Sequence, residues 1–286
     1  MVKTRHARAA GSAASIPVIE FERSSAASLG VELVGLRDLI AREVNHDLSR
    51  PQRPTFHHLF LVTEGRGTHT VDFVRHRLSP GLVLHVAPGQ VQQFGMERSL
   101  DAQLLVFEPD FVKRAPSRWP APRTFPVTRR ATIALLFEAA ARELEAFDGS
   151  AGARALLSTL VETLVLAVEK SPTENDASNP RTGLLARFQA ALEKSFSRTR
   201  EVAAYAAVLD CSPRTLARIC ERASGRSAKQ LIDERVVLEA KRLLAHGGAS
   251  AADISAQLGF AEPTQFGKFF RRTVGVTPAK FRARFV

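Results

Sequence analysis

The chain has 286 residues, which is enough for two domains of ordinary size. Its formal net charge is +11, and this charge is uneven: residues 181–286 carry 19 Lys and Arg against 9 Asp and Glu, or +10, whereas residues 1–180 carry +1. Only two cysteines are present, without metal-ligand spacing, which argues against a disulfide framework and suits a reducing compartment. There is no run of 18 apolar residues and no apolar signal segment, so we expect a cytoplasmic protein with no membrane partner.

Residues 1–15 are rich in Ala, Ser and Arg and predict a disordered tail. Residues 16–126 predict a β domain, because short β-rich runs alternate with turns that contain Gly and Pro. Many short strands of this kind favour a β-barrel or jelly roll, and such a barrel can enclose one small ligand. The expected strands are 16–21, 31–37, 56–63, 68–73, 82–86, 91–94 and 102–107.

Three segments of this domain form a recognisable pattern: His57-His58-Leu-Phe-Leu-Val-Thr-Glu-Gly-Arg-Gly-Thr-His69, then Leu78-Ser-Pro-Gly81 and Pro88-Gly89-Gln-Val-Gln92. The pattern resembles the cupin-type sensing domain of many AraC-family proteins. This resemblance implies a small-molecule effector held inside the barrel. The candidate effector-binding residues are His58, Phe60, His69 and His85.

The strand 56–63 has two chemically different faces. Alternation places His58 and Phe60 on one face and His57 and Leu59 on the other, and one of the two faces must line the interior. The pattern does not decide which face this is.

Cupin enzymes bind a metal through His and Glu side chains, so a metalloenzyme must be considered. This chain lacks the usual pair of His one residue apart followed closely by Glu, and Gln92 stands where a later His would be expected. We therefore expect no metal, no other cofactor and no enzymatic activity. A cupin metalloenzyme with an accessory helical domain is the less favoured alternative.

Residues 127–170 predict a pair of helices, 128–147 and 152–169, joined by Asp148-Gly149-Ser150. The second helix carries an apolar stripe that is wider than one contact with a barrel requires. The family resemblance implies that helices here dimerise the protein, and packing on its own barrel is the alternative. The candidate dimerisation residues are Leu157, Leu160, Val161, Leu164 and Val168. The polar segment 171–180 is the expected linker.

Residues 181–286 contain one unit twice, because shifting the chain by fifty positions aligns Ala206 with Ala256, Val208 with Leu258, and Leu216 with Phe266. Each copy predicts two short helices joined by a tight turn, at 201–209 and 213–224, then at 250–258 and 262–274. Ser212 is the expected N-cap of the second helix, and glycines close both second helices.

The second helix of each copy has an apolar stripe opposite a polar, largely cationic face. Such a helix suits the major groove of DNA, where Arg and Lys bond guanine, Gln bonds adenine, and further cations neutralise phosphates. A solvated helical face is the alternative for one copy, but the recurrence of the pattern favours DNA. The predicted DNA-binding residues are Arg214, Arg218, Arg222, Thr264, Gln265, Lys268, Arg271 and Arg272.

Between the copies, residues 228–246 predict one helix about 28 Å long at 1.5 Å per residue. A rod of this length could hold two reading helices in successive major grooves, about 34 Å apart, on one face of a duplex. A basic membrane-surface module is the competing explanation of the charge. It is disfavoured because the charge lies on repeated helix-turn-helix units.

The repeated region carries Ser212-Pro-Arg-Thr-Leu-Ala-Arg, then Gly259-Phe260, Gln265-Phe266, Phe269-Phe270-Arg271-Arg272 and Gly275-Val276-Thr277-Pro278. These motifs, in this order, resemble the AraC/XylS family over about the last hundred residues. The resemblance implies base contacts from Arg214, Ala217 and Arg218 in the first copy, and from Pro263, Thr264 and Lys268 in the second. Ala217 and Pro263 depart from that pattern, because neither side chain can form a hydrogen bond.

The sequence thus predicts an α+β protein: a cupin-like barrel (16–126), a helical pair (127–170), a linker (171–180) and an all-α DNA-binding domain (181–286) with two helix-turn-helix motifs joined by a long helix. We expect a ligand-responsive transcription regulator, more often an activator on family grounds. The expected partners are promoter DNA, a small-molecule effector, RNA polymerase and a second copy of the chain. A regulator controlled by a partner protein or by its abundance, without a small ligand, remains an alternative.

Overall fold

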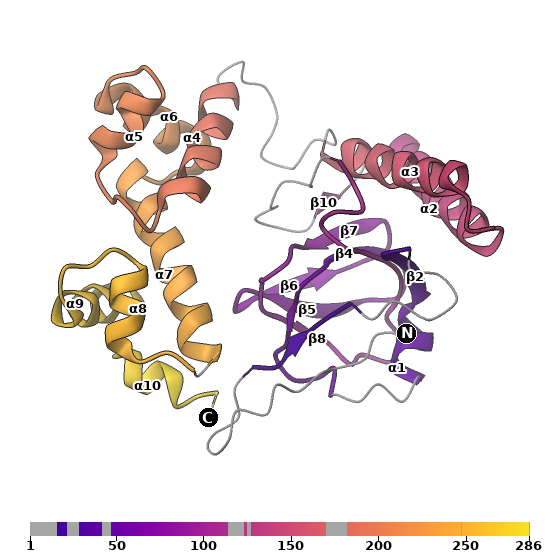
Figure 1. Cartoon of the computed structure of the whole chain (residues 1–286), viewed down its shortest axis with the longest axis horizontal. Coiled ribbons are helices and arrows are strands. Elements are labelled where there is room, and N and C mark those ends of the chain that lie inside the picture. Colours follow the sequence, from indigo (N-terminus) through magenta and orange to yellow (C-terminus); the bar gives the residue numbers. More distant parts are fainter. Residues whose placement is uncertain are drawn as a thin grey trace. The chain divides into compact units, whose positions relative to one another are not determined.

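The computed structural model describes residues 16–21, 29–41, 47–113, 123–124, 127–169, 182–246 and 248–285. The chain divides into two compact units, one containing Pro17–Ala177 and the other containing Ser178–Val286. The first unit combines sheets with helices, and the second is helical (Figure 1). The expected tail at 1–15 and the expected linker at 171–180 lie outside the described residues.

Antiparallel sheets dominate the first unit. Five strands pair in the order β10-β7-β4-β9-β2, and three pair in the order β6-β5-β8, while β1 and β3 form a short parallel pair. The strands of the larger sheet are β2 (Val31–Gly35), β4 (His57–Glu64), β7 (Leu82–Val86), β9 (Asp101–Phe107) and β10 (Arg123–Thr124). The others are β1 (Val18–Ile19), β3 (Arg53–Pro54), β5 (Gly67–Val71), β6 (Val74–Leu78) and β8 (Gln92–Phe94).

The five-stranded sheet buries both of its faces. Phe60 on β4 belongs to a core cluster that also contains Val71 and Phe94 of the smaller sheet, so the two sheets pack face to face. Leu59 on the same strand belongs to a second cluster, shared with the helices α2 and α3. The face of β4 that carries His58 and Phe60 is therefore the one that lies between the sheets.

Helices α2 (Val127–Glu145) and α3 (Ala151–Glu169) cover the outer face of the large sheet. Four of the predicted dimerisation residues are buried in this core and pack on their own sheet, which is the alternative that the sequence left open. Only Leu160 is partly exposed. The buried four are Leu157, Val161, Leu164 and Val168. By length and composition alone α3 could also cross a membrane, although one of its faces is committed to this core.

Several sequence predictions for the first unit need correction. The expected strand 31–37 ends at Gly35, and α1 (Leu36–Ala41) follows at once. β6 was not expected, because its sequence VRHRL carries two Arg and because its turn with β5 contains no Gly. Instead Asp72 and Phe73 form that turn with φ angles of 50° and 68°. The described strands form three separate sheets, so the expectation of a β-barrel or jelly roll is confirmed only as far as a sheet domain, without a closed barrel among these strands.

The second unit consists of seven helices within the described residues (Figure 1). The long helix α7 (Ala228–His246) runs between two helix pairs, and its bounds match the predicted rod. The first pair is α5 (Val202–Val208) with α6 (Pro213–Ser224), and the second is α8 (Ala251–Gln257) with α9 (Pro263–Val274). The helices α4 (Thr182–Ser195) and α10 (Pro278–Arg282), which were not predicted individually, pack before the first pair and after the second.

The structure shifts the repeat alignment by one residue in its first helices. The second helices are offset by fifty, since α6 begins at Pro213 and α9 at Pro263. The first helices are offset by 49, because Leu209 and Leu258 are the matching C-caps and both are buried. Val208, which the sequence aligned with Leu258, is instead 73% exposed. The turn of the second motif is therefore one residue longer.

Candidate nucleic-acid interface and effector site

The first candidate reading helix, α6, is fixed at both ends by its own sequence. The Ser212 hydroxyl accepts a hydrogen bond of 3.0 Å from the Thr215 backbone N–H, and Pro213 occupies the first helical position. Gly225 ends the helix in the left-handed conformation, with φ at 67°. These caps confirm the predicted helix 213–224 and determine which side chains face outward.

The inner stripe of α6 is buried, whereas the predicted DNA-contacting residues are exposed. Leu216 and Cys220 are fully buried in a cluster that includes Phe188 and Tyr205 from α4 and α5. Burial raises the pKa of the Cys220 thiol to about 11, so this cysteine stays protonated near neutral pH. On the opposite side, exposed to solvent, lie Arg214, Arg218, Glu221 and Arg222.

The second candidate reading helix, α9, repeats this division. Phe266, Phe269 and Phe270 are buried, and the ring centroids of Phe266 and Phe270 lie 5.9 Å apart. Glu262 is the N-cap residue, and its carboxylate accepts a hydrogen bond of 3.3 Å from the Thr264 hydroxyl. The outward, exposed residues are Thr264, Gln265, Lys268, Arg271 and Arg272.

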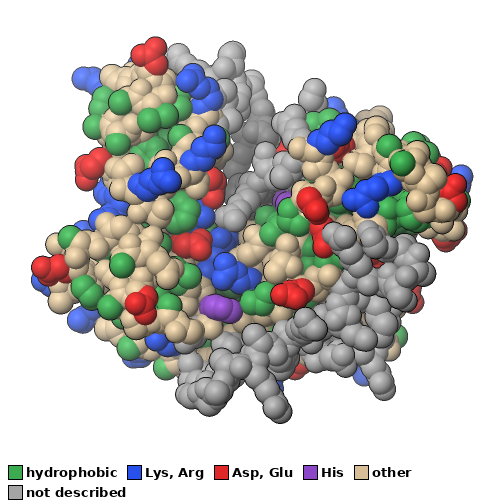
Figure 2. Space-filling view, in the orientation of Figure 1, with side chains coloured by type: hydrophobic (Ala, Val, Ile, Leu, Met, Phe, Trp, Pro, Cys, Tyr) green, Lys and Arg blue, Asp and Glu red, His purple; other side chains and the backbone are tan. Residues whose placement is uncertain are grey.

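Most of the outward cations have no competing acidic partner. Within the described part of the chain, no ion pair involves Arg214, Arg218, Arg222, Lys268 or Arg271. Arg272 differs, since its guanidinium lies 4.0 Å from the Asp233 carboxylate and 5.8 Å from the Phe269 ring. Figure 2 shows Lys and Arg side chains scattered among residues of other kinds on the visible face of the helical unit. Unpaired cations on two capped helices can neutralise phosphates and bond base edges.

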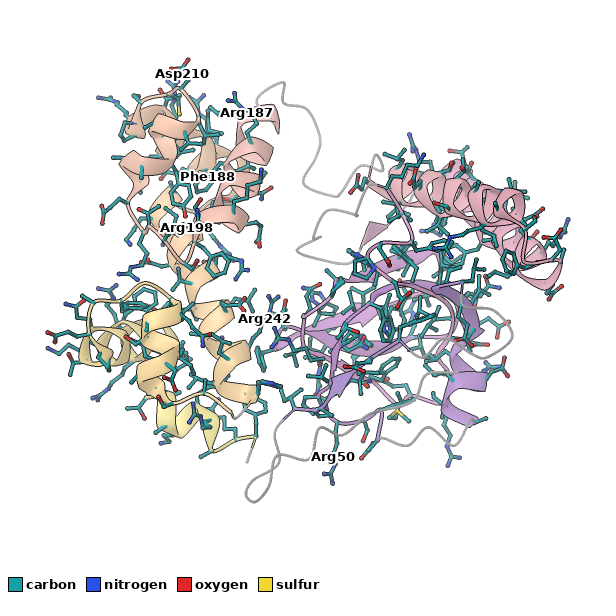
Figure 3. The ribbon with its side chains drawn as sticks, viewed as in Figure 1. Arg50, Arg187, Phe188, Arg198, Asp210 and Arg242 are labelled. Atoms are coloured by element: carbon teal, nitrogen blue, oxygen red, sulfur yellow. The ribbon has the colours of Figure 1, made fainter. Side chains whose placement is uncertain are left out.

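Two buried arginines of α7 form ion pairs, one with α4 and the others within α7 itself. Arg235 lies 2.8 Å from Glu193 of α4 and 3.1 Å from Glu239, and its guanidinium sits 3.7 Å from the Phe196 ring centre. Arg242, labelled on α7 in Figure 3, is also buried and lies 3.3 Å from Glu239. Sequence reasoning predicted the helix 228–246 but did not recognise that these two arginines are buried in it.

A second connection ties the two motifs together. The Arg200 guanidinium, just before α5, donates a hydrogen bond of 3.1 Å to the Leu258 carbonyl oxygen. It also lies 3.8 Å from the centre of the Phe260 ring. Phe260 lies in this longer turn, and its ring contacts those of Phe266 and Phe269. Arg200 therefore holds the turn of the second motif against the chain that leads into the first.

The candidate effector-binding residues do not share one face of the large sheet. His58, Phe60 and His69 lie together between the two sheets, and the ring centroids of Phe60 and His69 are 4.7 Å apart. His85 lies opposite Leu59 in the strand register, on the face toward α2 and α3. There its Nε2 is 3.0 Å from Nδ1 of His57. His85 therefore belongs to a different layer from the other three.

A sheet-containing unit joined to a unit with two helix-turn-helix motifs defines a DNA-binding transcription regulator. Residues 205–284 match a family model for a helix-turn-helix domain, and residues 34–163 match one for the AraC-like ligand-binding domain. The chain belongs to the AraC family. These matches cover both units and confirm the resemblance inferred from the sequence motifs.

Relatives with known names are regulators as well, not enzymes. The chain is 22% identical over 246 residues to the transcriptional activator RhaR of Enterobacter sp. strain 638, covering 80% of this chain and 85% of that one. It is 26% identical over 245 residues to RhaS of the same strain, covering 79% and 85%. Among solved structures, the DNA-binding domain of AdpA in complex with a target DNA is 30% identical, covering 38% and 94%, with a TM-score of 0.32.

Proposed function

We propose that this protein activates transcription at promoters that it binds with α6 and α9 in successive major grooves. The observation that carries the proposal is the matched pair of outward cationic faces at equivalent positions of two capped helices, each backed by a buried apolar stripe. The relatives RhaR and RhaS are named activators, which supports activation over repression. RNA polymerase is then the partner at the promoter, and the cytoplasm is the location.

A selection from random duplex DNA tests this function directly. The purified full chain is expected to enrich a sequence with two conserved blocks, whose centres lie about 10 base pairs apart, because each reading helix enters one turn of the groove. Footprinting should then protect both blocks on one face of the duplex. Enrichment of a single block, or of no sequence at all, would contradict the assignment of two reading helices.

The sheet unit is proposed to bind a small-molecule effector between its two sheets, as in a cupin-like jelly roll. His58, Phe60 and His69 are the proposed contacts, because they lie together in this buried layer. An effector can change promoter occupancy only if it binds one arrangement of the protein better than another. His85 is left out of this set, since it lies in the other layer.

A homodimer is proposed through the outer face of α3, in place of the buried residues first considered. Leu156 and Leu166 are 46% and 37% exposed on this face. Between them, the hydroxyls of Thr159 and Thr163 donate to the carbonyl oxygens of Ala155 and Thr159, at 2.8 and 2.7 Å. These bonds satisfy both hydroxyls within the helix, so neither needs a partner outside it. The face is therefore apolar and suited to packing against a second copy.

The double variant Leu156→Lys/Leu166→Lys tests this dimer in the full chain. We expect it to sediment as a monomer at concentrations where the parent protein is a dimer, because two cations per subunit would be buried against their counterparts. Glu138→Lys, on the exposed face of α2, is the control and should remain dimeric. A dimer that survives the double substitution would place the contact elsewhere.

A further inference from the structure

Three polar side chains lie deep between the two sheets. His58 on β4 is 5% exposed, His69 on β5 is 2% exposed and Gln92 on β8 is 1% exposed. His69 is paired with Phe94 in the strand register and Gln92 with Val71, and both hydrophobic partners belong to the core between the sheets. The three side chains therefore come from three strands into one buried layer.

Four polar atoms in this cluster lack a hydrogen-bond partner among the described residues. They are both ring nitrogens of His58, Nε2 of His69 and Oε1 of Gln92. A buried polar atom without a partner costs roughly 1–3 kcal/mol, and native cores contain few of them. Four such atoms in one layer indicate that a bound molecule supplies their hydrogen bonds.

The buried layer that holds the cluster contains no charged side chain among the described residues, and the Glu97 carboxylate, whose charge acts on His69, is exposed to solvent. Burial lowers the pKa of His58 to about 3, and burial likewise lowers that of His69 to about 3, although the Gln92 amide acts in the opposite direction. No Lys, Arg, Asp or Glu side chain is buried in the described part of the sheet unit. An anionic ligand would lose its hydration here without gaining a counter-charge, which is strongly unfavourable.

Aromatic rings flank the cluster on several sides. Phe56 stacks on His58 with ring centroids 4.7 Å apart, and Phe60 lies 5.8 Å from His58. On the other side, the Phe94 ring lies 4.9 Å from His69 in an edge-on arrangement. Flat faces of this kind pack well against a ring and poorly against a flexible polar chain.

We propose that the effector is an uncharged ring compound with hydroxyl groups, bound between the sheets by His58, His69 and Gln92. A neutral imidazole presents one hydrogen-bond donor and one acceptor, and a hydroxyl group can bond to either, because it both donates and accepts. The amide oxygen of Gln92 accepts a further hydroxyl proton. The inference rests on the proposed effector site of the sheet unit and adds the chemical class of its ligand. Phenols and cyclic polyols share this chemistry.

The test compares matched neutral and anionic compounds on the full chain. Resorcinol, benzyl alcohol, myo-inositol and methyl β-glucoside are titrated by calorimetry and thermal unfolding beside benzoate and glucuronate. At least one neutral compound is expected to bind and raise the Tm, because a ligand of the native state stabilises it. Comparing the two aromatic compounds with the two polyols shows whether the site prefers an aromatic or a saturated ring. Affinity should change less than twofold between pH 6 and 8, since neither partner titrates there.

Two variants separate recognition from packing. Gln92→Leu is expected to weaken the bound compound at least tenfold while raising the Tm of the unliganded protein, because it removes an unpaired buried oxygen. Gln93→Leu, on the opposite face of β8, is the matched control and should leave binding unchanged. A variant that is merely misfolded would lower the Tm instead.

Three results would overturn the inference. Binding of benzoate or glucuronate alone, tightening as the pH falls, would mean that an imidazole is protonated to hold an anion. No Tm change with any of the six compounds would mean that water fills the cluster. Unchanged binding by Gln92→Leu would place the site elsewhere. Specific DNA binding, measured on the same preparation, distinguishes these failures from a failure of the proposed regulatory function.

Discussion

The two helix-turn-helix motifs have the same arrangement of helices, but the residue that forms the turn differs between them. Asp210 makes the turn between α5 and α6 with φ at 54°, whereas Gly259 makes the equivalent turn between α8 and α9 with φ at 69°. A Cβ at Gly259 would lie 2.3 Å from the Ser197 carbonyl oxygen, so only glycine fits. Asp210 is exposed at the outer end of its motif (Figure 3), where a side chain has room. The close approach of the Ser197 backbone therefore requires glycine in the second turn, whereas the first turn can hold another residue.

The exposed side chains of α6 and α9 also differ, although they lie at equivalent positions of the two helices. The first motif presents Arg214 and Arg218 where the second presents Thr264 and Lys268. Glu221 in the first corresponds to Arg271 in the second. Arginine favours guanine, while the Gln265 of the second motif can bond adenine. The two motifs should therefore read different half-sites, so the bound sequence is expected to be asymmetric.

The largest expected effect is the loss of DNA binding with salt. If the protein neutralises about 6–10 phosphates, its affinity should fall about a thousandfold or more between 50 and 200 mM salt. Triple alanine variants of α6 (Arg214, Arg218, Arg222) and α9 (Lys268, Arg271, Arg272) divide this effect between the motifs. Each lost phosphate contact should reduce the slope of log affinity against log salt by about 0.9. A variant with the parental slope would show that its helix does not contact the backbone.

Single substitutions should next separate the base preferences of the two motifs. Arg218→Ala and Lys268→Ala are each expected to weaken specific binding by about 1–3 kcal/mol, and each should relax the preference in one block only. Arg187→Ala, which removes the same charge from the exposed surface of α4, is the matched control. Affinities for the selected site and its single-base variants, measured by anisotropy, provide the comparison. Relaxation of the same block by both variants would contradict the proposed division.

The parts of the structure that local chemistry determines were predictable from the sequence. Ser212, Pro213 and Gly225 define the bounds of α6, because capping is decided by a few adjacent residues. The repeat also identified Leu216 and Phe266 as buried positions, as the structure confirms. Contacts between distant segments were not predictable in this way. Arg200 meets Phe260 across sixty residues, and nothing near either position indicates the other.

The sheet unit shows the same limit more strongly. Alternation along β4 separated the two faces correctly but could not decide which was internal, since both are buried and both carry His. The core clusters show which face lies between the sheets, and the register with β7 separates His85 from His58. The apolar stripe of α3 was recognised, but the sequence left open whether it packs on the chain's own sheet, as four of its residues do, or on a second copy. A stripe that packs on its own sheet and one that packs on a second copy have the same period.

A smaller effect should distinguish the two turns by stability. Gly259→Ala is expected to destabilise the folded chain by about 1–3 kcal/mol, because it combines a left-handed backbone with a close approach to the Ser197 oxygen. Gly248→Ala, where an added Cβ meets open space, is the control. Urea unfolding followed by circular dichroism measures the difference. Equal stabilities would mean that the segment before α5 does not pack on the second motif as described.

The smallest effect belongs to the turn of the first motif. Asp210→Gly should stabilise the protein by at most about 1 kcal/mol, because the left-handed conformation that strains Asp is freely available to Gly, although Gly also gains entropy in the unfolded chain. The same unfolding experiment detects the change, and DNA affinity should remain at the parental value because the α6 caps are untouched. A clear loss of stability would instead show that the Asp210 side chain makes a contact worth more than the backbone strain. The turn of the first motif would then be held as specifically as that of the second.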